Sequence, residues 1–249
     1  MITVSIVSHG QGSIVEDLLL DLIPYTEVSK IILTNNIPEN NLTVPEEISD
    51  RLLVIENKIP KGFGANHNSA FCHCDSPYYC VLNPDLRVAN NPFPELISLL
   101  NEDNIFIVAP VMLNPDGEIE DSARKFPSLL GLPLKALGIS DGRLNYHLDD
   151  GPLLAPWVAG MFMLFKSENY RMLNGFDEEY FLYYEDVDIC ARSWQLGKAV
   201  KLHPGLTIVH EARRASRKDP TYMRWHAASM ARYFRKHLLY SLGFTPKGC

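Results

Sequence analysis

Two acidic clusters, far apart in the chain, stand in contexts that could support phosphate binding and proton transfer. In the first, a hydrophobic run ending in Val81 and Leu82 leads directly into Asn83, Pro84 and Asp85. Mg²⁺ favours oxygen ligands and usually keeps substrate phosphates in its shell, so Asp85 could share a divalent cation with a diphosphate. The alternative is a simple turn in which Asp85 caps the following segment.

The second cluster comprises Glu185, Asp186 and Asp188, at the predicted start of a helix below the aromatic run Phe181–Tyr184. A general base that deprotonates a hydroxyl needs a carboxylate held rigidly at the wall of a cleft, and Asp186 is the candidate. Helix capping is a competing role for these carboxylates. Asp188 could instead pair with Arg192 four residues later.

His210 ends a predicted strand, and its imidazole could bind a divalent metal together with Asp85. A lone histidine is more often structural, so this role depends on Asp85 being near.

Glycine and asparagine residues gather in a predicted loop-to-helix transition at positions 61–68. Gly62, Asn66 and Asn68 offer backbone amides and side-chain donors to an anion or a ribose. The dinucleotide pattern G-x-G-x-x-G fails because residue 67 is His67. This failure disfavours a nicotinamide-dependent dehydrogenase.

The first half of the chain alternates short β-branched runs with helical patterns, as expected for βαβ units and a mostly parallel sheet. Ligands collect at the carboxyl ends of strands in such sheets, where polar clusters follow the predicted strands here. The predicted strands are Ile2–Ser8, Lys30–Thr34, Leu52–Ile55, Tyr78–Leu82 and Ile105–Ala109, and the helices are Ile14–Ile23, a stretch after Gly64, and Pro94–Leu100.

The second half predicts a buried strand over Trp157–Phe165 and a helix over Asp186–Leu196 that stops at Gly197. A long amphipathic helix is expected over Tyr222–Tyr240. Its apolar residues follow one face at spacings of three or four: Met223, Ala227, Met230, Phe234 and Leu238.

The composition is that of an ordinary globular protein, with 249 residues, of which 46% are hydrophobic and 21% charged. One domain is the default at this length. No apolar run is long enough to span a bilayer and the N-terminus does not read as a signal peptide, so we expect a cytoplasmic protein. Five cysteines without framework spacing fit a reducing compartment.

Charge is unevenly distributed along the chain. Nine basic and two acidic residues follow Leu206, so this end carries +7 and the remainder carries −14 within a net charge of −7. Phosphate groups or an anionic membrane surface suit such a basic end better than nucleic acid on an otherwise acidic protein. A solvated helix face is the alternative.

The motifs described above, taken together with several other short segments and in their order along the chain, resemble glycosyltransferase family 2. Within that family they resemble the bacterial rhamnosyltransferases that build O-antigen and related cell-surface glycans. The resemblance implies an α/β GT-A fold with a nucleotide-sugar-binding half (1–110), an acceptor half (111–212) and a basic helical tail (213–249). The segments that carry it are Val7–Gly10, Gly62–Asn68, Leu82–Asp85, Arg124–Pro127, Trp157–Gly160, Asn174–Asp177, Tyr184–Asp188 and Arg224–His226.

The resemblance also implies roles for individual residues. Asp85 would ligate a metal, Mg²⁺ or Mn²⁺, that bridges the donor diphosphate, with His210 as a further ligand and Asp186 as the catalytic base. The remaining implied contacts are Asn83 with the nucleotide or ribose, Ser8, His9 and Asn35 with the nucleobase, and Arg124, Trp157 and Glu185 with the sugar or acceptor. Asn35 stands where the family usually has aspartate, which leaves base selectivity open.

The implied reaction is direct displacement with inversion, from dTDP-β-L-rhamnose to a GlcNAc-diphosphate-polyprenol at the inner membrane face. Basic tail residues such as Arg213 would meet the lipid diphosphate or anionic headgroups. Two alternatives stay open: another donor, such as a UDP-hexose or furanose nucleotide, and a module that binds nucleotide sugars without catalysis.

Overall fold

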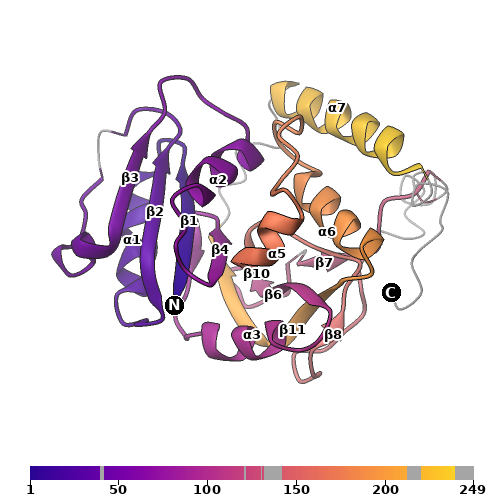
Figure 1. The fold of residues 1–249 in the computed structure, drawn as a ribbon, viewed down its shortest axis with the longest axis horizontal. Coiled ribbons are helices and arrows are strands. Elements are labelled where there is room, and N and C mark those ends of the chain that lie inside the picture. Colours follow the sequence, from indigo (N-terminus) through magenta and orange to yellow (C-terminus); the bar gives the residue numbers. More distant parts are fainter. Residues whose placement is uncertain (40–41, 121, 130, 132–141, 212–219, 239–249) are drawn as a thin grey trace.

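The computed structural model describes residues 1–39, 42–120, 122–129, 131, 142–211 and 220–238 (Figure 1). The first half alternates strands and helices: β1 (Ile2–Ser8), α1 (Gly12–Leu22), β2 (Val28–Asn35), a 3₁₀ turn η1 (Glu46–Arg51), β3 (Leu52–Glu56), α2 (Phe63–Phe71), β4 (Tyr78–Leu82), β5 (Leu86–Arg87), α3 (Phe93–Leu100) and β6 (Ile105–Leu113). The second half contains β7 (Ala123–Arg124), β8 (Leu153–Leu154), β9 (Trp157–Val158), β10 (Phe162–Lys166), α5 (Ser167–Met172), α6 (Glu185–Gln195), β11 (Ala199–His210) and α7 (Pro220–Lys236).

One nine-stranded sheet joins both halves, in the order β3-β2-β1-β4-β10-β6-β11-β5, with β8 also paired to β11. β1 is parallel to β2 and β4, and β2 is parallel to β3. β10 runs antiparallel between β4 and β6, while β11 is parallel to β6. The expected α/β fold is therefore confirmed, and the sheet is mixed, because β5, β8 and β10 pair antiparallel with their neighbours. β10 joins the two halves.

Each face of the sheet carries its own hydrophobic core, because successive side chains of a strand point to opposite faces. In β4, Cys80 and Leu82 pack with α1 and α3, whereas Tyr79 and Val81 pack with α5, α6 and α7. β10 divides its side chains in the same way. This double burial explains why both strands read as continuous apolar runs.

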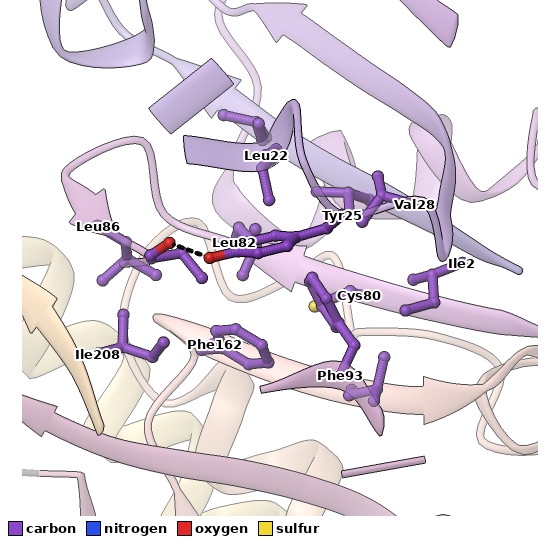
Figure 2. Packing of buried hydrophobic residues seen from close by; sticks show 14 of the residues in the cluster. Ile2, Leu22, Tyr25, Val28, Cys80, Leu82, Leu86, Phe93, Phe162 and Ile208 are labelled. Atoms are coloured by element: carbon purple, nitrogen blue, oxygen red, sulfur yellow. Dashed lines mark hydrogen bonds between the residues drawn. The ribbon is translucent and has the colours of Figure 1, made fainter. Parts of the chain in front are cut away.

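The strand that follows Asp85 is anchored to α1. The Asp21 carboxylate accepts hydrogen bonds from Arg87 Nε (2.8 Å) and Nη2 (2.9 Å), and from the backbone amide of Val88 (2.8 Å). The Tyr25 hydroxyl donates a hydrogen bond to the Val88 carbonyl at 2.7 Å, inside the core that α1 and α3 form with the sheet (Figure 2). The backbone just after Asp85 is therefore held firmly.

The prediction of one strand over Trp157–Phe165 is wrong. The segment forms two strands in different sheets: β9 pairs with β7, and β10 lies in the main sheet. The chain turns between them at Gly160 and Met161. Hydrophobicity alone could not reveal this break, since both pieces are apolar.

The two predicted helices are found, with differences in the second. α6 ends before Gly197, whose positive φ of 71° suits glycine at a helix end. α7 packs through the buried Ser229 and Tyr233, and His237 is buried just after the helix. Of the predicted apolar stripe, Phe234 packs against the core, whereas Met223 and Leu238 are 68% and 56% exposed. The part of the expected helix beyond Leu238 lies outside the described residues.

A buried carboxylate explains why polar residues of α7 face inward. Asp188 on α6 is fully buried and contacts Arg192 Nε (2.7 Å), Lys236 Nζ (2.8 Å) and His237 Nε2 (2.7 Å). Burial by itself raises the pKa of Asp188, but the hydrogen bond from His237 and the charges of Arg192 and Lys236 hold it well below its ordinary value. The expected Asp188–Arg192 pair is confirmed, as a buried link and not as a surface one.

Among the described residues, no helix combines the length and the apolar character needed to cross a bilayer.

Asp188→Asn should lower the free energy of unfolding by about 1.5–3 kcal/mol at pH 7, because the substitution removes the buried carboxylate that pairs with the partly exposed Arg192 and Lys236. Urea denaturation measures this. Because the folded-state pKa is depressed, the contribution of Asp188 is present above the ordinary aspartate pKa of 3.8 and is lost as the pH falls below it. The difference between wild type and variant should therefore shrink below about pH 4.

Asp75→Asn is the matched control, since Asp75 pairs with Lys30 but its side chain is 74% exposed. Its effect should be small, as is usual for surface ion pairs. An unchanged urea midpoint for Asp188→Asn would show that α7 does not depend on this contact.

Candidate active site

Polar side chains form a row where the first three parallel strands end. Ser8 of β1 is in register with Asn35 of β2, and Asn35 is in register with Glu56 of β3. Asn35 Nδ2 donates to Glu56 Oε1 at 2.6 Å, and Ser8 Oγ donates to Glu39 Oε2 at 2.9 Å. The buried Asn35 Oδ1 has no hydrogen-bond partner among the described residues. The predicted nucleobase contacts of Ser8 and Asn35 are untested and stay predictions.

An asparagine network links this row to α2. Asn57 Nδ2 donates to Asn36 Oδ1 (2.9 Å) and to Asn66 Oδ1 (2.7 Å). Asn36 Nδ2 also lies 3.2 Å from His9 Nδ1 and donates to the Lys61 carbonyl at 2.9 Å. Asn66, predicted to contact the nucleotide sugar, thus holds the loop before α2, and its ligand role stays a prediction.

The glycines at the start of α2 allow a close approach between chain segments. A Cβ at Gly62 would lie 2.6 Å from the Phe181 carbonyl oxygen, and one at Gly64 would lie 2.6 Å from Phe176 Cβ. Asn68 accepts hydrogen bonds from the Tyr170 hydroxyl and the Phe176 amide through Oδ1. The observed contacts of Gly62 and Asn68 are therefore structural, and their predicted contacts with the nucleotide sugar remain untested.

Asp85 and His210 are brought together by strand pairing. β5 runs antiparallel to the end of β11, with His210 opposite Leu86, and the Glu211 amide donates to the Asp85 carbonyl at 2.8 Å. His210 Nε2 then lies 3.3 Å from Asp85 Oδ2. The two predicted metal ligands are thus adjacent although they are far apart in the sequence.

A third acidic residue, Glu120, completes this group. His210 Nδ1 lies 2.6 Å from Glu120 Oε2, so the imidazole stands between two carboxylates. Burial by itself lowers the pKa of His210, but hydrogen bonds and charge from Asp85 and Glu120 outweigh this effect and raise it above its usual value.

The donor set suits a divalent cation in part. The buried Asp85 Oδ1 has no partner among the described residues, and imidazole nitrogen with carboxylate oxygen is a common ligand pair for Mn²⁺. No group of three His, Cys, Asp or Glu side chains in the described ranges has the arrangement of a complete metal site. Two protein ligands suit a cation that completes its shell with substrate phosphates and water.

Asp186 lies at the start of α6, which follows two tyrosines in the left-handed region, with φ of 69° at Tyr183 and 68° at Tyr184. Its Oδ2 accepts a hydrogen bond from the Gly160 amide at 3.0 Å, and its Oδ1 accepts one from the Val187 amide at 2.8 Å. Burial raises the pKa of Asp186, while these two amides oppose the change by favouring the carboxylate. The result is a fixed carboxylate that is more basic than usual.

Glu185 faces the interior, with an exposure of 5%. Burial and the neighbouring charge of Asp186 raise its pKa well above the ordinary value, and its Oε2 has no partner among the described residues. The predicted acceptor contact of Glu185 stays a prediction.

The segments that carry Asp85 and Asp186 are both hydrogen-bonded to residues 159–161, which we call the 159–161 turn. The Gly160 amide binds Asp186, and the Met161 carbonyl accepts a hydrogen bond from the Asn83 amide at 2.8 Å, two residues before Asp85. Trp157 lies on β9, which leads into this turn, and Arg124 is its cross-strand partner on β7. Arg213 lies outside the described residues.

The sequence prediction included Asn36 in a polar cluster at a strand end but missed other polar residues near the candidate site: Glu39, Glu56, Asn57 and Glu120. Glu56 directly follows the predicted strand Leu52–Ile55. Because ligands collect at the ends of parallel strands, this position could have identified Glu56 as a candidate. Glu120 carries no such signal, because its position depends on how the segment after β6 folds back.

Sequence similarity to known glycosyltransferases supports an enzymatic function. The chain is 28% identical to rhamnosyltransferase WbbL of Escherichia coli K12 over 256 residues, which cover 98% of this chain and 97% of that protein. It is 27% identical to the N-acetylglucosaminyl-diphospho-decaprenol L-rhamnosyltransferase of Mycobacterium tuberculosis over 149 residues, covering 56% of this chain and 48% of that protein. No family model matches the chain.

Solved structures support the fold. GalNAc-T7 with UDP, GalNAc and Mn²⁺ matches 97% of this chain with a TM-score of 0.68 and 17% identity, and the match covers 50% of that chain. The mannosyltransferase PcManGT of Pyrobaculum calidifontis, with GDP-Man and Mn²⁺, matches 95% with a TM-score of 0.63 and 14% identity, covering 64% of that chain. The expected GT-A fold is confirmed.

In metal-free protein, the imidazole of His210 should titrate above its usual pKa of 6.5. Asp85→Asn and Glu120→Gln should each lower this pKa, because each removes a negative charge that stabilises the imidazolium. Histidine NMR titration measures both effects. Since the folded-state pKa is raised, the stability that these contacts contribute is complete below pH 6.5 and is lost as the pH rises through the folded-state value.

A His210 titration at or below 6.5 in the wild type would contradict this assignment. His147, which lies on an exposed loop far along the sequence from both carboxylates, provides an internal comparison in the same spectra.

Proposed function

We propose that this chain, a glycosyltransferase with the GT-A fold that is similar to bacterial rhamnosyltransferases, transfers L-rhamnose from dTDP-β-L-rhamnose to a lipid-linked GlcNAc-diphosphate acceptor with inversion. One observation carries the proposal: Asp186 and the Asn83–Asp85 segment are both hydrogen-bonded to the 159–161 turn. The Asp186 carboxylate and the backbone two residues before Asp85 are therefore held by the same three residues.

In the proposed reaction, Asp186 removes the proton from the acceptor hydroxyl, and that oxygen attacks the anomeric carbon while the bond to the diphosphate breaks. The Gly160 and Val187 amides hold the Asp186 carboxylate in place before the acceptor arrives. Burial raises the pKa of Asp186, so it accepts a proton more readily than an exposed aspartate would. A single displacement of this kind inverts the anomeric configuration.

Asp85 and His210 are the residues that would hold Mg²⁺ or Mn²⁺. When bound, such a cation would stabilise the negative charge that develops on the departing nucleoside diphosphate. The Oδ1 atom of Asp85 is available to such a cation, because it is buried and has no hydrogen-bond partner among the described residues. The Mn²⁺ in the two solved neighbours supports this role.

The names of the relatives support rhamnose as the sugar, and the row Ser8, Asn35 and Glu56 is our proposed nucleotide contact surface. Asn35 offers both an amide donor and a free carbonyl oxygen at this edge, which suits hydrogen bonding to a nucleobase. The alternative donors are UDP-hexoses and furanose nucleotides, because no residue described here selects one sugar by itself.

The acceptor side is proposed to involve Trp157, on the strand that leads into the 159–161 turn, and its cross-strand partner Arg124. The mycobacterial relative, whose name includes a diphospho-decaprenol acceptor, supports a lipid-linked substrate. The exposed Arg224 and Arg235 of α7, with the basic tail that includes Arg213, would then face anionic headgroups at the inner membrane face.

Asp186→Asn should reduce turnover about 10²–10⁴-fold, because the amide cannot accept the acceptor proton. Donor binding, measured by calorimetry with the nucleotide sugar, should remain close to that of the wild type. The substitution keeps the size of the side chain, and its Oδ1 can still accept the Gly160 hydrogen bond. Wild-type turnover in this variant would show that Asp186 is not the base.

A panel of nucleotide sugars, offered with a GlcNAc-diphosphate-lipid acceptor, tests the donor and the metal together. We expect transfer from dTDP-rhamnose, loss of that transfer with EDTA, and recovery when Mn²⁺ or Mg²⁺ is added. Transfer from a UDP-sugar alone would replace the rhamnose assignment while keeping the enzyme class. Transfer that survives complete metal removal would overturn the role of Asp85 and His210.

A further inference from the structure

We propose that Glu120 is a positioning residue that fixes the His210 ring and its tautomer, so that Nε2 presents a lone pair beside Asp85. This inference rests on the proposed metal-assisted transfer, because it gives His210 the role of a ligand. Glu120 lies outside every motif considered in the sequence, and its role follows from two distances at one imidazole.

The chain delivers Glu120 to His210 by folding back after β6. Gly117 has a φ of 82°, and its amide donates to the Asn114 carbonyl at 2.9 Å, which closes a tight turn. The returning chain then places the Glu120 amide 2.9 Å from the Met112 carbonyl. Met112 is itself in register with Ile208 of β11, two residues before His210. Backbone pairing alone therefore brings the Glu120 side chain to the end of β11.

Both ring nitrogens of His210 face carboxylates, at unequal distances. Glu120 Oε2 lies 2.6 Å from Nδ1, and Asp85 Oδ2 lies 3.3 Å from Nε2. An ionised carboxylate only accepts hydrogen bonds, so the two compete for the single proton of a neutral imidazole. The shorter contact favours the proton on Nδ1, which leaves Nε2 free to bind a cation.

Partial burial strengthens this control. The side chains of His210, Asp85 and Glu120 are 13%, 15% and 23% exposed, so water competes only weakly for these hydrogen bonds. Without Glu120, the remaining carboxylate would draw the proton to Nε2. The nitrogen that faces Asp85 would then be a donor and could not act as a ligand.

A second histidine on β11 provides the matched comparison. His203 Nε2 lies 3.2 Å from Glu95 Oε2, but the Glu95 side chain is 65% exposed. Among the described residues, neither Asp85 nor Glu120 forms an ion pair with His203. Glu95→Ala therefore removes a carboxylate from a histidine of the same strand without touching the candidate site.

Binding of Mn²⁺ to metal-free protein with saturating dTDP, followed by the EPR signal of free Mn²⁺, is the first test. Glu120→Ala should weaken Mn²⁺ binding about 10- to 100-fold, the range typical for loss of a hydrogen-bond partner of a metal ligand. Glu120→Gln should weaken it less, because the amide oxygen can still accept from Nδ1–H. Glu95→Ala should leave it unchanged.

The background variant His210→Ala separates positioning from direct ligation. If Glu120 acts through His210, adding Glu120→Ala to His210→Ala should cause little further loss of Mn²⁺ affinity. A full additional loss in that background would overturn the proposal and make Glu120 an independent ligand.

Nitrogen-15 NMR of the neutral histidines in metal-free protein tests the tautomer directly and needs neither Mn²⁺ nor turnover. His210 should carry its proton on Nδ1 in the wild type and on Nε2 in Glu120→Ala, whereas His203 should give the same signals in both. An unchanged His210 tautomer in Glu120→Ala would overturn the proposal. Absence of Mn²⁺ binding in the wild type, with the tautomer shift present, would instead count against the metal role in the proposed function.

Discussion

The 159–161 turn is the constraint on which the arrangement of the site depends. Its three residues bind three separate segments: the Ala159 amide donates to the Ser122 carbonyl, the Gly160 amide donates to Asp186, and the Met161 carbonyl accepts from the Asn83 amide. A Cβ at Gly160 would lie 3.3 Å from the Asp186 Cβ and 3.4 Å from the Phe63 ring. Glycine at this position therefore lets helix α6 approach the turn closely enough for its carboxylate to accept the amide.

The same turn connects the two segments to which we assign the metal ligand and the base. Asn83 extends from β4 in the first half of the chain, and α6 belongs to the second half. β10, which begins directly after the turn, pairs antiparallel with β4, so the Asn83–Met161 hydrogen bond continues that pairing past the end of the strand. The geometry of the candidate site is in this sense an extension of the pairing between the two central strands of the sheet.

The sequence predicts the acidic clusters and most elements because each has a local signal. Strands β1 and β4 were predicted with their observed bounds from runs of β-branched and aromatic residues, and Asp85 follows such a run directly. The Asp85–His210 contact could be anticipated only from the resemblance, since it requires β5 to pair with β11. Glu120 and the break at Gly160 could not be predicted, because both depend on which strands become neighbours. The packed face of α7 was missed because a buried aspartate, Asp188, selects polar partners on it.

Helix α7 belongs to the site although it contributes no reacting group. The left-handed conformations of Tyr183 and Tyr184 are costly for residues with a side chain, about 1–2 kcal/mol each, and persist only where neighbours enforce them. α7 supplies those neighbours: the Tyr184 ring packs 5.5 Å from that of Tyr233, and Ser229 Oγ donates to the Leu182 carbonyl at 2.9 Å. The strained Tyr183–Tyr184 segment ends where α6 begins, and Asp186 is the second residue of that helix. The contacts of the buried Asp188 with Lys236 and His237 hold α7 against the Tyr183–Tyr184 segment, so this structural network also helps to position Asp186, the proposed base.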